Sequence, residues 1–333
     1  YAQVYNNIGL AYDGLKDTDL ALKYKNQARD LYAKLRGSDH HTVGMATGNI
    51  GLTYEVKGDY VMAIEYLKKS VEIRLKSQPA DDDDVGRDYL NIGLMFLKMN
   101  EVKDGVSFLE KAKLIYDKYD KNINKARIYN RLSIGYLMLH DLPKAMACNQ
   151  QAILANTLNF EKSDFDSFPN QADMLSYYES VIAYIAKADI YRIKNDPSGW
   201  VRGLQILNEA DTILKEKAIT FSSAKDRLEL ATLNSFFTES GMLLASKLFN
   251  ATHDPAYLNK AFYFSERSKA NELLADIQLS RAINLSRISK SVKARKEELS
   301  RRMSTLQQQV ADAYGAQNQP LITKLKSQEL DLS

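Results

Sequence analysis

The sequence predicts an all-α protein, a right-handed α-solenoid of helix hairpins that ends in a long C-terminal helical hairpin. A short segment recurs four times, and in each copy a small residue stands three residues before an aromatic one. The copies are 42, 42 and 40 residues apart, and a fixed period of this length is typical of stacked repeat arrays. The 333 residues include only 6 Pro and 15 Gly, which suits long uninterrupted helices.

Each of these four repeats carries three small residues at constant spacing. The second follows the first by 12 residues and the third follows by another 7. We expect two helices to cross there, because a bulky side chain would push them beyond the usual separation of about 8–10 Å. The small residues, repeat by repeat, are Gly9, Ala21 and Ala28; Gly51, Ala63 and Ser70; Gly93, Gly105 and Ala112; and Ser133, Ala145 and Ala152.

The second repeat shows the helical pattern within one unit. Its apolar residues after Asp59 recur in steps of three and four, which match one face of a helix and not a strand. They are Tyr60, Ala63, Ile64, Leu67, Val71 and Leu75. Turn residues, Lys57 to Asp59 here and His140 to Asp141 in the fourth repeat, separate the paired helices. One unit cannot bury its own apolar face, so the units are expected to stack into a continuous core.

This pattern resembles the tetratricopeptide repeat. The usual unit has about 34 residues, and the 42-residue units here resemble the kinesin-light-chain subtype, whose helices run about one turn further. The linker over residues 37–43 contains the Gly-x-Asp-His segment that often joins units of that subtype. The sequence departs from the pattern at Arg131, where the other repeats carry Asn, and at Gly105, where Ala is usual.

We divide the chain into three parts. Residues 1–155 hold the four regular units, and residues 156–280 hold two degenerate units with turns lengthened around Pro197 and Pro255. Residues 281–333 are expected to form a charged helical hairpin that links to a missing C-terminal domain. Because Tyr1 falls inside a repeat, we also expect the natural N-terminus to lie upstream.

A second resemblance rests on residues 261–274. The order Ala-x-x-x-Ser-Glu-x-Ser-Lys-Ala, followed by a charged hairpin, resembles bacterial proteins that join tetratricopeptide repeats to a CHAT domain, a caspase-like cysteine peptidase. The resemblance implies a regulatory or sensor region of a bacterial, cytoplasmic protein. The family's catalytic His and Cys match nothing here. We therefore expect no enzyme activity from this chain, although the full-length protein would carry the peptidase.

The residues suited to chemistry have structural alternatives. Cys148 is the only cysteine, which excludes an internal disulfide; it is either a packed side chain or a reactive thiol. His140 lies eight residues away, roughly 12 Å along a helix, too far for a catalytic pair. The His40–His41 pair could ligate a metal or belong to the linker, and the Asp81–Asp84 run could bind calcium or cap a helix. No glycine loop for phosphate is present, so no cofactor is expected.

The charge is concentrated between residues 281 and 302. Eight basic residues against two acidic ones give +6 in this segment, while the whole chain has a net charge of +3. The segment is a solvated helix face, a surface for an acidic protein, or a site for nucleic acid or membrane. No aromatic residues are nearby to stack on bases, so no nucleic acid is expected. No run of about 18 apolar residues predicts a membrane span.

The remaining candidate is a concave groove lined by the first helix of each unit. Asn7, Asn49, Asn91 and Arg131 hold equivalent positions, and a ladder of amides suits an extended protein or peptide ligand. Alternatively, these side chains bond across to neighbouring helices. Charges on the same helices change from acidic to basic along the array, which suggests a ligand of mixed charge; they are Asp13, Glu55, Arg87, Lys98 and Arg127.

The predicted site therefore consists of Asn7, Asn49, Asn91, Arg131, Arg87 and Arg127. The function that fits is a binding scaffold that regulates an appended peptidase. Two other functions stay open. One is a sensor or adaptor region for a histidine kinase or a DNA-binding output, and the weaker one is an RNA-binding helical repeat.

Overall fold

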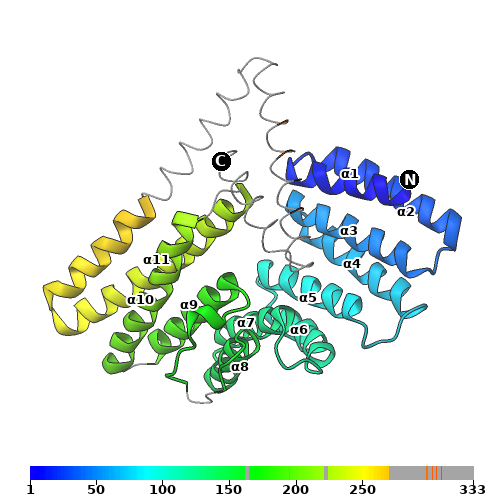
Figure 1. The fold of residues 1–333 in the computed structure, drawn as a ribbon. Coiled ribbons are helices and arrows are strands. Elements are labelled where there is room, and N and C mark those ends of the chain that lie inside the picture. The colour runs from blue at the N-terminus through cyan, green and yellow to red at the C-terminus, as the bar shows by residue number, and fades with distance from the viewer. Residues whose placement is uncertain are drawn as a thin grey trace. The chain divides into compact units, whose positions relative to one another are not determined.

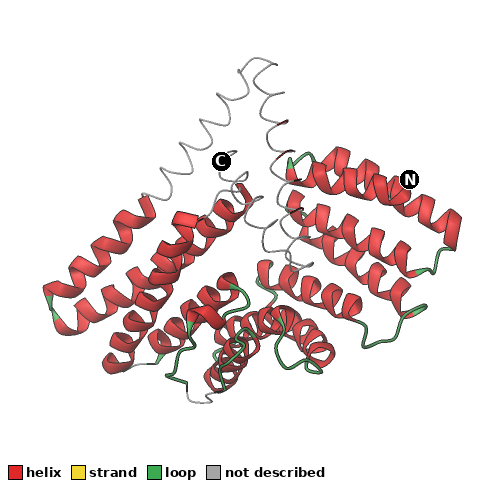
Figure 2. Cartoon of the chain, viewed as in Figure 1, coloured by secondary structure: helices red, strands yellow, loops and turns green. Residues whose placement is uncertain are grey.

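The computed structural model describes residues 1–161, 165–194, 196–220 and 224–269, with isolated positions at 298, 302, 305 and 309. Over the described ranges the secondary structure is helical, with no strand, as Figure 2 shows. This confirms the predicted all-α class. The C-terminal hairpin predicted over residues 281–333 lies outside the described ranges, and the division at residues 155 and 280 stays a prediction.

The helices pack in consecutive pairs, and Figure 1 shows the pairs following one another along the chain. Tyr1–Ser268 forms one compact unit. The regular pairs are α1 (Ala2–Gly14) with α2 (Thr18–Arg36), α3 (His41–Lys57) with α4 (Tyr60–Leu75), α5 (Asp83–Lys98) with α6 (Val102–Tyr116), and α7 (Ile123–Met138) with α8 (Leu142–Ala155). Then follow α9 (Tyr177–Ile193) with α10 (Pro197–Thr220), and α11 (Ala224–Thr252) with a helical stretch over 255–269.

The turn inside each regular pair repeats one backbone conformation. Lys16, Gly58, Asn100 and His140 hold the same place and have φ of 60°, 83°, 62° and 59°. Only Gly58 avoids the steric cost of this left-handed conformation. The residue that follows is acidic, and in three pairs its carboxylate accepts a backbone N–H of the next helix; these caps are Asp17, Asp59 and Asp141. The turn therefore ends one helix and starts the next within three residues.

The predicted helix crossings are confirmed by their close approach. A Cβ added to Gly51 would lie 3.0 Å from the carbonyl oxygen of Ala63. In the third pair, a Cβ on Gly93 would lie 3.0 Å from the carbonyl oxygen of Gly105. Since real Cβ atoms rarely come this close to another atom, glycine lets the two backbones meet.

The aromatic residue of each repeat stacks on a second aromatic residue of the partner helix. The ring centroids are 5.6 Å apart for Tyr12 and Tyr24, 5.3 Å for Tyr54 and Tyr66, and 5.5 Å for Phe96 and Phe108. In the fourth pair the corresponding partner is Cys148. There Tyr136 donates its hydroxyl to the Glu110 carboxylate at 2.9 Å instead.

Buried polar side chains connect successive pairs. The ammonium of Lys25 is completely buried, pairs with Asp13 of α1 and donates to Thr53 Oγ1 of α3 at 2.7 Å. Burial lowers the pKa of Lys25. At the next junction, Arg74 of α4 lies 3.1 Å from the Asp88 carboxylate of α5. A shift in register between pairs would leave these groups unpaired inside the core, which is costly.

The longest connection lies between α8 and α9, and the sequence did not reveal it. It includes the short helix η1 (Gln171–Asp173) and a β-bridge between Thr157 and Met174. Its Phe165 and Phe168 rings each lie 4.7 Å from the buried ammonium of Lys187 on α9. The connection thus covers the start of the fifth pair.

Candidate binding groove

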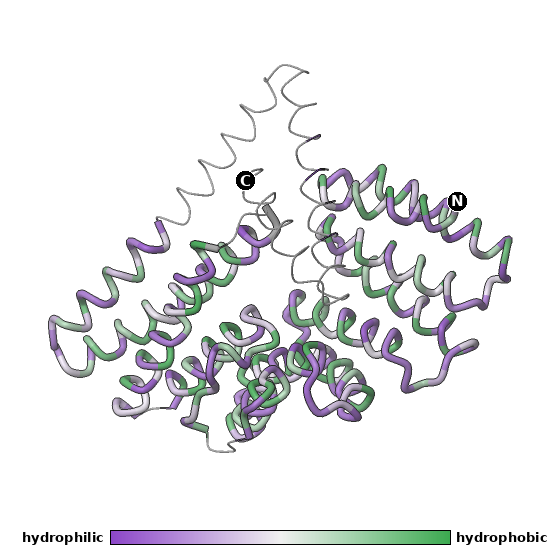
Figure 3. Tube along the Cα trace, in the orientation of Figure 1, coloured by the Kyte–Doolittle hydropathy of each residue, from purple (hydrophilic) through white to green (hydrophobic). Residues whose placement is uncertain are grey.

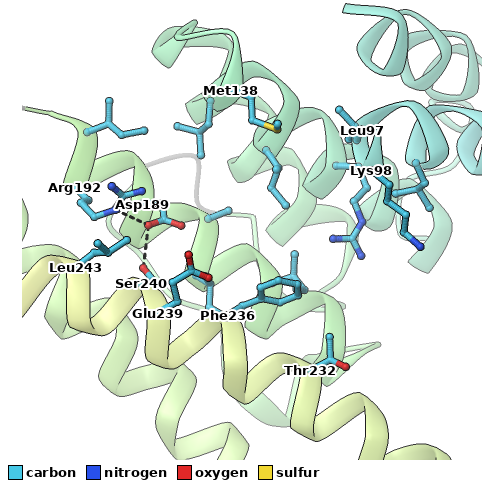
Figure 4. Close-up of a pocket in the computed structure, with 18 of the residues that line it drawn as sticks. Leu97, Lys98, Met138, Asp189, Arg192, Thr232, Phe236, Glu239, Ser240 and Leu243 are labelled. Carbon is cyan, nitrogen blue, oxygen red and sulfur yellow. Dashed lines mark hydrogen bonds and ion pairs between the residues drawn. The ribbon is translucent and has the colours of Figure 1, made fainter. Parts of the chain in front are cut away.

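A groove of about 830 Å³ runs along the first helices of successive pairs. It is lined by α3, α5, α7, α9 and α11, and Figure 4 shows part of the lining. Aliphatic and aromatic side chains dominate it: Leu94, Leu97, Ile134, Leu137, Met138, Ile182, Ile185, Ile193, Phe236 and Leu243. Helices distant in sequence therefore contribute to one apolar surface.

Three of these apolar side chains are unusually open to solvent. Met138 is 41 % exposed, Phe236 46 % and Leu243 45 %. In Figure 4, Phe236 and Leu243 lie along α11, and Leu97 lies across the groove from them. Covering a large apolar side chain completely contributes roughly 1.5–3 kcal/mol. The groove therefore has free energy available for binding an apolar ligand.

Most charges in the groove are paired inside the chain. Asp189 accepts from Arg192 Nε at 2.8 Å and from Ser240 Oγ at 3.0 Å, the two dashed contacts in Figure 4. Lys98 Nζ lies 2.8 Å from the Glu55 carboxylate. These four polar side chains and Ser240 already have partners, so they offer little to a ligand.

Arg131 and Glu239 differ from these paired residues. Within the described ranges, neither makes an ion pair or a hydrogen bond, and the Nε atom of Arg131 is buried without an acceptor. A buried donor without an acceptor costs about 1–3 kcal/mol. Arg131 is thus a cation in the groove that lacks a counter-charge.

Of the six predicted site residues, Arg131 alone lines this groove. Asn49 Nδ2 donates to Asn6 Oδ1 of α1 at 2.9 Å, which is the alternative of bonding to a neighbouring helix. Asn7 accepts from Gln3 Nε2 at 2.9 Å on an exposed surface. Asn91 does not reach the lining. The structure does not bring the predicted amides together along the groove.

The predicted charge gradient is largely compensated inside the chain. Arg127 Nε lies 2.8 Å from the buried Glu179 carboxylate. Arg87 pairs with Asp84 one turn earlier on α5. Together with the Asp13 and Glu55 pairs described above, these contacts leave little of the gradient for a ligand of mixed charge.

The other chemical candidates have structural roles. Cys148 is buried, and burial raises the pKa of its thiol to about 12, which fits the packing interpretation. His40 Nδ1 accepts from the N–H of Thr42 and caps α3, while Asp82 caps α5. No cluster of three metal-ligating side chains occurs in the part of the chain that the structure describes.

Comparisons with known proteins agree with this fold. Residues 1–76 match the family model of the tetratricopeptide repeat. No curated protein matches the chain. Among solved structures, a putative kinesin light chain with nearly identical TPR-like repeats from Podospora anserina matches with a TM-score of 0.51 and 15 % identity, covering 64 % of this chain and 94 % of its own.

Two other structures cover more of the chain. The apo form of RapI matches with a TM-score of 0.54 and 16 % identity over 81 % of this chain and 84 % of its own. A signal-transduction ATPase with a tetratricopeptide repeat sensor from Pyrococcus horikoshii matches with a TM-score of 0.55 and 16 % identity, covering 83 % of this chain and 37 % of its own. At these identities the likeness shows the fold, a solenoid of tetratricopeptide-type helix pairs.

The described helices are not membrane spans. None of them combines the length and the apolar content that crossing a bilayer requires. Figure 3 shows hydrophilic positions interspersed along the helices of the array. This agrees with the absence of a predicted span from the sequence.

Proposed function

We propose that the chain is a scaffold that binds a protein or peptide segment in the groove along α5, α7, α9 and α11. A solenoid of this type is suited to protein–protein interaction, because its helix pairs present an extended surface. The observation that carries the proposal is the apolar lining with Met138, Phe236 and Leu243 left open to solvent. Exposed apolar surface of this kind, rimmed by polar residues, is typical of interaction sites.

The scaffold would act as the regulatory or sensor region of a bacterial CHAT peptidase. The support is the resemblance over residues 261–274 stated above. Ligand binding would regulate the peptidase if the ligand preferred one of two states of the whole protein. A reading frame downstream of Ser333 without a caspase-like domain would contradict this role. A kinase or DNA-binding module there would favour the sensor alternative, and the Pyrococcus horikoshii ATPase also carries such repeats as a sensor.

The groove itself is tested by selection on the intact chain. Peptides from a display library are selected, and the best binders are measured against Phe236→Ser and against Phe262→Ser. Phe262 is a matched control because it is 65 % exposed and does not line the groove. We expect Phe236→Ser to weaken binding at least tenfold and Phe262→Ser to leave it unchanged. Equal effects of the two substitutions would contradict the groove as the site.

A further inference from the structure

We propose that the occupant of the groove is an amphipathic α-helix with a carboxylate that pairs with Arg131. This inference rests on the proposed function and specifies its ligand. It replaces the extended peptide expected from the sequence, because the asparagines that suggested an extended peptide do not line the groove. Three features of the lining lead to it.

The first feature is the lack of available partners for a ligand backbone. The polar side chains Asp189, Arg192 and Ser240 bond to one another, and Lys98 pairs with Glu55. An extended peptide against the aliphatic wall would lose water from its N–H and C=O groups without gaining partners, at about 1–3 kcal/mol for each group. An α-helix satisfies its backbone internally, so it enters such a groove without this cost.

The second feature is the distribution of exposed apolar side chains. Met138 comes from α7, whereas Phe236 and Leu243 are seven residues apart on α11, two helical turns along one face. A ligand helix presents side chains at i, i+3, i+4 and i+7 along one stripe, and this stripe suits an apolar groove between helices. The ligand stripe would cover these side chains together.

The third feature is the charge that the chain does not compensate. Arg131 lies among the apolar side chains with its Nε buried and without an acceptor. A carboxylate can accept two parallel hydrogen bonds from one guanidinium, which is the strongest pairing available to Arg131. Glu239 on α11 also lacks a partner within the described ranges, and it would face a basic residue of the ligand. The two charges together would fix the direction of the ligand helix.

The test uses display peptides of about 18 residues, roughly five helical turns. One library fixes leucines at i, i+4, i+7 and i+11 with a glutamate between them, and a second library carries the same composition in scrambled order. Binders that depend on Phe236 but not on Phe262 are retained. We expect them to come from the first library, to lose at least tenfold in affinity when a central residue becomes proline, and to gain helical circular dichroism on binding.

The carboxylate is tested by a double-mutant cycle. Arg131→Met removes the charge and keeps an apolar stem, and Glu→Gln in the peptide removes the partner. We expect each change alone to weaken binding about tenfold and both together to weaken it no further. The pairing of Arg131→Glu with a Glu→Arg peptide should restore binding. A thermal melt of each variant shows that the array is intact.

The outcomes separate this inference from the proposed function. If no binder depends on Phe236, both are wrong. If binders depend on Phe236 but tolerate proline and gain no helicity, the ligand is not helical, while the groove remains the site. If the effects of the two charge removals add, Arg131 does not bind the carboxylate. If Phe236→Ser dissociates a dimer of the chain and no peptide competes, a second copy occupies the groove and the inference is overturned.

Discussion

Ser133 Oγ donates a hydrogen bond to the carbonyl oxygen of Ala145 at 2.9 Å, inside the crossing of α7 and α8. The equivalent residue in the first three pairs is glycine, and there the partner's carbonyl oxygen approaches the place of the absent Cβ. Serine is accommodated because its hydroxyl converts this close approach into a hydrogen bond. The crossing thus requires either no side chain or a side chain that can donate.

The first prediction concerns Gly51 at the equivalent crossing of the second pair. Gly51→Ala places a Cβ 3.0 Å from the Ala63 carbonyl oxygen and 3.1 Å from Leu67 Cγ. Although alanine favours a helix by up to about 1 kcal/mol, overpacking costs about 1–3 kcal/mol. We expect a net loss of about 1 kcal/mol in the free energy of unfolding, measured with urea.

Gly14→Ala is the matched control for that substitution. An added Cβ on Gly14 meets nothing within 4 Å. This variant should be as stable as the parent chain or slightly more so. If both variants gained stability, the crossing would not require glycine.

These crossings were predictable from sequence, and the groove was not. Crossing residues such as Gly51 and Ala63 belong to one hairpin, so their constant spacing carries the information. The groove combines Leu97 of α5 with Phe236 of α11, two residues that share no motif. Equivalent positions in the repeats also did not mean equivalent surroundings. Asn49 bonds to Asn6, whereas Arg131 at the corresponding place lacks a partner within the described ranges.

The second prediction concerns Glu179, which is buried where α9 meets α7. Its carboxylate accepts from Arg127 Nε at 2.8 Å and from Asn130 Nδ2 at 3.0 Å. Removing one member of a buried ion pair costs about 3–5 kcal/mol. Arg127 is 41 % exposed and is rehydrated easily, so we expect Glu179→Gln to lower the free energy of unfolding by about 2 kcal/mol.

Asp19 provides the comparison for this buried pair. It lies 3.3 Å from Lys57 at an exposed surface. Exposed pairs contribute little to stability, so Asp19→Asn should leave the denaturant midpoint unchanged. If the two substitutions had equal effects, Glu179 would not hold the fourth and fifth pairs together.

The third prediction concerns the reactivity of Cys148. With its pKa raised to about 12 by burial, about one thiol in ten thousand is ionised at pH 8. We expect a thiol-specific reagent to modify the folded chain only as fast as the chain opens, and to modify the urea-unfolded chain within minutes. Rapid modification of the folded chain would support the reactive-thiol alternative.

The fourth prediction concerns the pH dependence of stability, through Asp88 at the junction of α4 and α5. Ser70 Oγ donates to its carboxylate at 2.6 Å, and Arg74 Nε lies 3.1 Å away. Burial nevertheless raises the pKa of Asp88 from 3.8 to about 6, since the desolvation of the carboxylate exceeds the attraction of Arg74 and Arg87. The folded chain therefore holds this proton more tightly than the unfolded chain.

A raised carboxyl pKa favours the folded state at low pH. The contribution of Asp88 is fully present below about pH 4 and is lost as the pH rises through about 6, to a total of at most about 3 kcal/mol. Asp88→Asn cannot titrate, and its amide keeps an oxygen that can accept from Ser70. We expect the difference in unfolding free energy, variant minus parent, to shift in favour of the variant between pH 4 and pH 7. Urea titrations at each pH measure this difference. A constant difference would mean that Asp88 stays ionised throughout, held by the Arg74 pair against the cost of its burial.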